Sequence, residues 1–135
     1  MDLIDYKILD ILKINGRIAV SDLAKQILLS APATKERITK MEEAGIIEGY
    51  TIKVNHKKLD KSIEAFILFE TVNCQAFREF CLSQENILEC HRLAGKYSYL
   101  VKIVATDMTE LEIFIDQALK FGSSSTHIVF STVIK

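Results

Sequence analysis

Apolar residues recur at helical spacing three times in the first 45 residues of the chain. Ile4, Ile8 and Ile11 share one face of the first such segment, since residues three or four apart lie on the same side of a helix. Ser30 is a favourable N-cap for the third segment, and Pro32 falls in the first turn, where a missing N–H is harmless. The pattern predicts helices over residues 2–14 and 20–28, and a third from Ser30 to the stop at Gly45.

Beyond Gly45 the pattern changes to alternating apolar and polar positions, which is typical of half-buried strands. A first alternating segment covers residues 46–54 and would act as a wing or a tether. The remaining order of strands and helices is βαββαβ, which gives a four-stranded antiparallel sheet with both helices on one face, a ferredoxin-like arrangement. The predicted elements are strand 62–72, helix 75–84, strand 87–94, strand 97–106, helix 108–120 and strand 125–134.

The fold class that follows is α+β, with an N-terminal winged helix-turn-helix and a C-terminal ferredoxin-like domain. We expect residues 1–50 to form the helix-turn-helix, residues 51–60 a tethering strand and linker, and residues 61–135 the ferredoxin-like domain. One face of the predicted sheet is left without a covering layer. Pairing of this face with that of a second copy would cover it, so we expect a homodimer.

The third helix carries the candidate DNA contacts. Two short helices joined by about three residues have the outline of a helix-turn-helix, whose second helix enters the major groove. Glu36, Glu42 and Glu43 dilute the positive charge of the third helix, so solvated charge on an ordinary three-helix bundle is an alternative explanation. The residues assigned to the outer face of this helix are Thr34, Lys35, Arg37 and Lys40.

Composition narrows the function classes. The formal net charge is −1, and 26% charged with 49% hydrophobic residues is typical of a globular protein and excludes a disordered chain. The sequence has no apolar run long enough for a membrane helix and no signal peptide at its start, so we expect no membrane association and a cytoplasmic protein. The spacing of Cys74, Cys81 and Cys90 matches neither a disulfide framework nor a metal site, and no glycine-rich phosphate loop occurs. We therefore expect no metal and no cofactor.

Short segments along the whole chain carry a family resemblance. They are Ile4–Leu9, Asn15–Ile18, Asp22–Ala24, Leu29–Ser30, Glu36–Ile38, Met41–Tyr50, Gly95–Lys102 and Thr106–Met108. In this order and spacing the chain resembles the Lrp/AsnC (feast/famine) transcription regulators of bacteria and archaea. The resemblance implies a regulator that binds specific sequences in double-stranded DNA and responds to an amino acid or a related metabolite. It also implies dimerisation through the sheet and assembly to octamers.

The resemblance also implies two sets of site residues. The recognition helix would place Pro32, Thr34, Lys35 and Arg37 on DNA, with Lys40 toward the phosphates. Ser98 stands where an acidic residue is common in the family, so an effector ammonium group would lose a charge partner there, and Leu28 stands where glycine is frequent. The implied effector-binding residues are Gly95, Tyr97, Ser98, Tyr99, Ser125 and Thr126.

Two other functions remain open at this point. Haem-pathway decarboxylases of the siroheme type are similar in fold to this family, and His56, His91 and His127 could serve such chemistry. A ligand-sensing module that regulates another protein is the second alternative. Basic residues on the third helix have little purpose in either case, so the sequence favours DNA binding and a protein that is not an enzyme.

Overall fold

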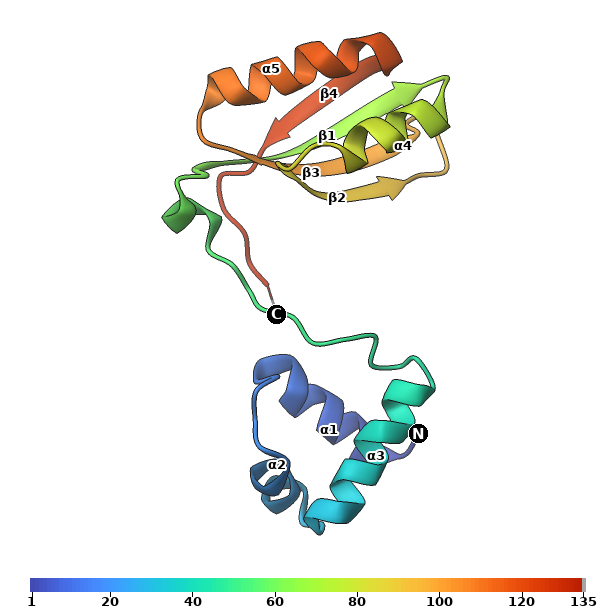
Figure 1. Ribbon diagram of the computed structural model, residues 1–135, viewed down its shortest axis with the longest axis vertical. Coiled ribbons are helices and arrows are strands. Elements are labelled where there is room, and N and C mark those ends of the chain that lie inside the picture. The colour runs from blue at the N-terminus through green and yellow to red at the C-terminus, as the bar shows by residue number, and fades with distance from the viewer. Residues whose placement is uncertain (135) are drawn as a thin grey trace. The chain divides into compact units, whose positions relative to one another are not determined.

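The computed structural model describes residues 1–134. The chain divides into two compact units, Met1–Lys53 and Val54–Lys135. The division falls inside the segment 51–60 that the sequence assigns to a tether. We call the two parts the helical unit and the sheet unit, and each is described by itself (Figure 1).

The helical unit consists of α1 (Leu3–Ile14), α2 (Val20–Ile27) and α3 (Ala31–Glu43), as the periodicity predicts. Asp2 caps α1 by accepting from the N–H groups of Ile4 and Asp5, and the Asp5 carboxylate accepts from the N–H of Asp2 in return. This reciprocal capping box satisfies N–H groups that a helix start otherwise leaves unpaired. The three helices pack around a small core of Ile8, Leu23, Ile27 and Met41.

The turn between α2 and α3 is closed by a residue in the left-handed conformation. Leu28 has φ 59° and ψ 42°, and the N–H of Leu29 donates to the carbonyl of Ala24 at 3.0 Å. A branched side chain in this region costs about 1–2 kcal/mol, which is why glycine is the usual choice. The Leu28 side chain is 89% exposed, so packing does little to offset this cost.

The prediction of a strand, and so of a wing, over residues 46–54 is wrong. In the part of the chain that the structure describes, this segment has no strand. Alternating apolar and polar residues give an extended segment one apolar and one polar face, but a strand also needs a hydrogen-bonded neighbour. None of the strands in residues 1–134 pairs with this segment. Its alternate apolar side chains, Tyr50, Ile52 and Val54, are exposed.

The sheet unit begins with a short 3₁₀ helix, η1 (His56–Leu59), in a segment predicted as loop. Its sheet is antiparallel with strand order β2-β3-β1-β4, and Figure 1 shows both long helices on the same face. This is the predicted ferredoxin-like arrangement. The elements are β1 (Ile63–Thr71), α4 (Cys74–Leu82), β2 (Ile87–Arg92), β3 (Tyr99–Ala105), α5 (Met108–Ala118), η2 (Leu119–Phe121) and β4 (Gly122–Ile128).

Aromatic side chains fill the core between this sheet and its helices. The ring of Phe77 on α4 lies 4.6 Å from that of Phe69 on β1 and 5.0 Å from that of Tyr99 on β3, centroid to centroid. All three side chains are at most 1% exposed. Aromatic rings at such distances add attraction beyond the area they bury, so this cluster ties α4 to the centre of the sheet.

The last strand differs from its predicted bounds. It begins at Gly122 rather than at 125 and ends at Ile128, and residue 135 of the predicted domain lies outside the described part of the chain. Gly122 has φ 147°, and a Cβ at this position would lie 1.8 Å from the carbonyl oxygen of Glu70. The strand can therefore begin there only because the residue is glycine.

Within residues 54–134 of the sheet unit, no helix or strand covers the sheet face opposite the helices. Phe66, Leu68 and Leu100 on this face are half-buried, and the Lys102 ammonium group lies 5.8 Å from the ring centre of Phe66. Ile103, which the alternation left open to either face, is 1% exposed in the core on the helix side. None of the helices in residues 1–134 has the length and apolar character needed to cross a membrane.

Candidate functional site

The outer face of α3 presents exposed polar side chains along one stripe. Pro32, Lys35 and Thr39 are exposed at spacings of three and four residues, which places them on one side of the helix. Lys40 is also exposed, and its ammonium group lies 2.7 Å from the Glu36 carboxylate. Thr39 was missed by the sequence analysis, although its position four residues after Lys35 could have indicated it.

Thr34 does not lie on this outer face, and its assignment there is wrong. The residue is 0% exposed, and its hydroxyl donates to the carbonyl of Ser30 at 2.9 Å. A threonine hydroxyl in a helix commonly bonds to the carbonyl four residues earlier, which satisfies it internally. Thr34 therefore packs the first turn of α3 and is not a direct contact for a ligand of the outer face.

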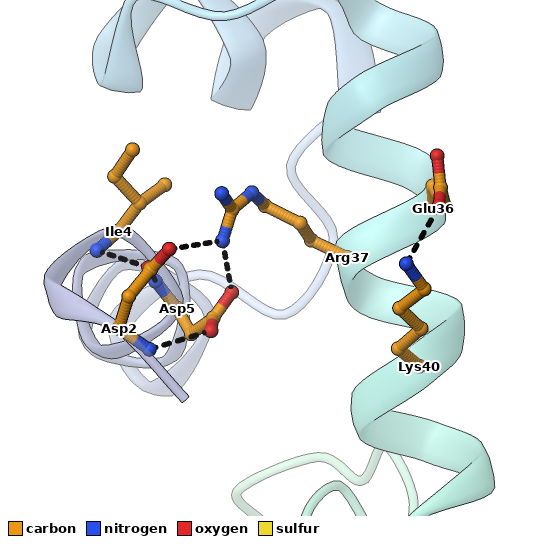
Figure 2. A network of polar contacts seen from close by, with 6 residues as sticks. All are labelled: Asp2, Ile4, Asp5, Glu36, Arg37 and Lys40. Atoms are coloured by element: carbon orange, nitrogen blue, oxygen red, sulfur yellow. Dashed lines mark hydrogen bonds and ion pairs between the residues drawn. The ribbon is translucent and has the colours of Figure 1, made fainter.

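Arg37 is held against the start of α1 rather than extended into solvent. Its Nη1 donates to Asp2 Oδ2 at 2.8 Å and to Asp5 Oδ1 at 2.7 Å, as Figure 2 shows. Both carboxylates also form the capping box of α1, so one guanidinium joins α3 to the N-terminus of another helix. The Arg37 side chain is 30% exposed in this arrangement.

The charges of this network reinforce one another. Hydrogen bonds from the backbone, and next from Arg37, lower the pKa of Asp2 and of Asp5 below the ordinary value. Hydrogen bonds to Asp5 and Asp2 in turn raise the pKa of Arg37. Both carboxylates therefore stay ionised at neutral pH, and the link between the helices is a charged one.

The predicted effector turn is tied to β1 by backbone hydrogen bonds. The N–H of Ser98 donates to the carbonyl of Phe69 at 2.7 Å, and its hydroxyl lies 3.3 Å from both the N–H and the carbonyl oxygen of Thr71. Gly95 has φ 131°, a conformation that favours glycine. Ser98 thus has a structural role in fixing the turn.

The other predicted effector residues lie on different surfaces. Tyr99 is buried and donates its hydroxyl proton to the carbonyl of Cys74 at 3.3 Å, whereas the Tyr97 ring lies beneath the Lys96 ammonium group. Ser125 pairs with Leu68 and Thr126 with Ile67, and successive strand residues point to opposite faces. A single cavity inside one subunit cannot hold both side chains.

His91 and His127 do not come together. His91 is on β2 and His127 on β4, the two outer strands of the sheet, with β3 and β1 between them. Each has its own neighbour: His91 Nε2 lies 2.9 Å from Glu89 Oε2, and His127 Nε2 lies 3.0 Å from the Ser125 hydroxyl. Within residues 1–134, no group of three or more His, Cys, Asp or Glu side chains is placed to hold a metal ion.

Sequence models of two domain families match the chain. The AsnC-type helix-turn-helix domain matches residues 1–42, and the Lrp/AsnC ligand-binding domain matches residues 64–135. The chain belongs to the Lrp/AsnC family. It is therefore a helix-turn-helix transcription regulator with a C-terminal ligand-binding domain, as the resemblance implied.

Individual Lrp/AsnC proteins match over nearly the full chain. The HTH-type transcriptional regulator YezC of Bacillus subtilis is 39% identical over 132 residues, covering 98% of this chain and 95% of YezC. The solved structure of B. subtilis LrpC has a TM-score of 0.93 at 31% identity and covers 99% of this chain and 97% of LrpC. A transcriptional regulator of Neisseria meningitidis, solved as a complex with L-Met, has a TM-score of 0.89 at 25% identity, covering 100% and 93% of the two chains.

Proposed function

We propose that this Lrp/AsnC protein binds operator DNA as a homodimer, with the α3 helices of two subunits in successive major grooves. The observation that carries the proposal is the exposed stripe of α3, where Pro32, Lys35 and Thr39 face outward from a helix-turn-helix. One short helix neutralises few phosphates, so a second copy is needed for affinity and for reading two half-sites.

Within this interface, Lys35 is the direct contact of α3 and Lys40 a phosphate contact, while Arg37 has a positioning role. Arg37 already donates to two carboxylates, and a base contact would require breaking both bonds. Its function in this proposal is to hold α3 at a fixed angle to α1. The expected readers of DNA are therefore Pro32, Lys35, Thr39 and Lys40.

The uncovered sheet face supports the homodimer. Phe66, Leu68 and Leu100 would be removed from water by an equivalent face, and burial of apolar surface is favourable by about 25 cal/mol per Å². Octamers would then form from four such dimers, and this higher assembly belongs to the same proposal.

A small metabolite is the proposed effector, bound where the Gly95–Tyr99 turn of one subunit meets Ser125 or Thr126 of another. The related Neisseria regulator binds L-Met, which supports an amino acid or a chemically similar ligand. Ser98 supplies no negative charge for an ammonium group, so ligands that lack this group, such as keto acids, are favoured here.

Regulation without catalysis is the favoured function. The decarboxylase alternative needs its histidines in one site, and His91 and His127 lie on opposite edges of the sheet. A protein that acts on the genome of a bacterium or an archaeon also works in the cytoplasm, which supports the expected location.

The decisive experiment is selection of operators from a random duplex library by the full-length protein, followed by affinity measurements with variants. We expect selected sites with two-fold symmetry and half-sites about one helical turn apart. Lys35→Ala should weaken binding to the selected site, whereas Lys40→Ala should weaken all sequences alike and reduce the dependence on salt. Selection of no sequence, or unchanged affinity in both variants, would overturn the proposal.

A further inference from the structure

A cleft between α4 and β2 lies at one edge of the sheet unit. Its volume is about 470 Å³, and a second cavity of about 470 Å³ shares Arg78, Arg92 and Tyr99 with it. Apart from Tyr99, the lining comes from α4, β2 and the loop between them, all within one subunit. Volumes of this size suit small metabolites.

Two arginines give the cleft a positive charge without a partner. Arg78 belongs to α4 and Arg92 to β2, both are exposed, and neither forms an ion pair with another residue of the range 1–134. Burial raises the pKa of Tyr99, and the charges of Arg92 and Arg78 both act against this rise. Both arginines line the cleft together with Tyr99.

The acidic residues of the cleft have other partners. Glu89 Oε2 lies 2.9 Å from His91 Nε2, and Glu79 Oε1 accepts from Gln75 Nε2 at 3.1 Å. These partners leave the negative charges in place, because the Gln75 amide is neutral and His91 is charged only when it is protonated. The cleft is lined by two arginines and one glutamate, Glu89, so its formal balance is +1. Guanidinium groups bind carboxylates through paired, charge-assisted hydrogen bonds, which are among the stronger polar contacts in proteins.

The rest of the lining is largely apolar. Leu82, Ile87, Leu88 and Cys81 line the same cavity as the arginines. Leu82 is 85% exposed, so a ligand that covers it would remove apolar surface from water. Charge beside an apolar wall matches a molecule with a carboxylate at one end and a short hydrocarbon chain at the other.

We propose that the cleft between α4 and β2 binds a small monocarboxylate with a short apolar chain, its carboxylate held between Arg78 and Arg92. This site shares Tyr99 with the proposed effector turn, but the rest of its lining comes from α4, β2 and the loop between them within a single subunit. A ligand there bridges α4 to the edge strand β2 and stabilises the sheet unit by mass action.

Hexanoate is the probe that tests the proposal, with hexanamide as its neutral counterpart and L-norleucine as its zwitterionic one. Calorimetric titration of the full-length protein should show that hexanoate binds and hexanamide does not. Arg78→Gln and Arg92→Gln should each weaken hexanoate binding about tenfold, the usual cost of one charge-assisted bond. Arg17→Gln is the matched control, because Arg17 is exposed in the helical unit and should leave binding unchanged.

Cys90 provides a local readout of the same cleft. Its thiol lines the cavity and is exposed, so alkylation of Cys90 followed by mass spectrometry reports directly on occupancy. Saturating hexanoate should slow this alkylation several-fold in the wild type and in Ser98→Asp, but not in the arginine variants.

Three results would overturn the proposal. They are the absence of hexanoate binding, hexanoate binding that both arginine substitutions leave intact, and an unchanged rate of Cys90 alkylation at saturation. If Ser98→Asp abolishes binding while Arg78→Gln does not, the carboxylate binds at the turn instead of the cleft. Tighter binding of L-norleucine that still depends on Arg78 and Arg92 supports the site and identifies amino acids as its ligands.

Discussion

The helical unit and the sheet unit are held together in different ways. The helical unit has a core of a few aliphatic side chains and depends on polar contacts at its helix ends, such as the Asp2–Asp5 capping box and its link to Arg37. The sheet unit is built on strands far apart in sequence and on an aromatic cluster around Phe77. A unit with few buried side chains is sensitive to charge, whereas a well-packed unit is sensitive to lost volume.

The strongest test of this contrast removes the centre of the aromatic cluster. Phe77→Ala should destabilise the sheet unit by about 3–5 kcal/mol, because it deletes a fully buried ring and leaves a cavity. Hydrogen exchange resolved by segment should show faster exchange throughout the strands and unchanged protection in α1–α3. Phe130→Ala is the matched control, since Phe130 is 94% exposed. Equal loss of protection in both units would contradict the division.

Charge should matter more in the helical unit. Asp5→Asn removes a negative charge near α3, which by simple electrostatics would favour DNA binding. If Arg37 positions α3 through Asp5, the substitution instead lowers the melting temperature of the helical unit and weakens operator binding. Asp10→Asn on the same helix is the control, because the Asp10 carboxylate is exposed and lies 3.3 Å from the exposed Lys13 ammonium group.

Arg37→Ala separates the two roles of that residue. A positioning residue affects selected and unrelated DNA alike and lowers stability without DNA. A base reader would lose affinity at one base pair alone, with stability unchanged. That second outcome would restore the direct contact expected from the sequence.

A substitution in the turn of the helix-turn-helix should change stability less and in the opposite direction. Leu28→Gly should stabilise the helical unit by about 0.5–1 kcal/mol, because it relieves the left-handed strain of a leucine that is 89% exposed. Thermal unfolding followed by circular dichroism measures the change. Gly122→Ala is the contrasting substitution: it places a Cβ against the Glu70 carbonyl and must destabilise the sheet unit. If Leu28→Gly lowers stability instead, the leucine side chain packs against the rest of the helical unit in solution.

The charge of Glu110 in the sheet unit should affect the pH dependence of stability only at acidic pH. The N–H of Thr106, and next the Lys61 ammonium group, lower the pKa of Glu110 from 4.5 to about 2. Because the pKa is lower in the folded state, the ionised Glu110 carboxylate stabilises the fold at pH values above its unfolded-state pKa. This stabilisation is lost as the pH falls from 4.5 toward 2. Glu110→Gln should therefore flatten the stability profile across this interval. A profile identical to that of the wild type would show that Glu110 is not linked to folding.

Much of the fold could be predicted because its signals are local. The periodicity of Ile4, Ile8 and Ile11 and the Ser30 cap place the helices, and the βαββαβ order leaves few ways to arrange the sheet. The strand predicted over residues 46–54 was wrong for a related reason. Alternation is a property of a single strand, whereas a strand forms only beside a hydrogen-bonded neighbour, which the pattern does not reveal.

The sequence by itself determined the two units, their long helices, the four strands of the sheet and the family, since each follows from short-range spacing and motif order. Only the tertiary structure decided what the site residues do. A pattern shows that Thr34 and Arg37 are polar residues on a helix, but not that one is buried against Ser30 and the other bonded to Asp2 and Asp5. It likewise could not bring Arg78 and Arg92 to one cleft. Contacts between elements distant in the chain depend on how the helices and strands pack, and packing is a property of the folded whole.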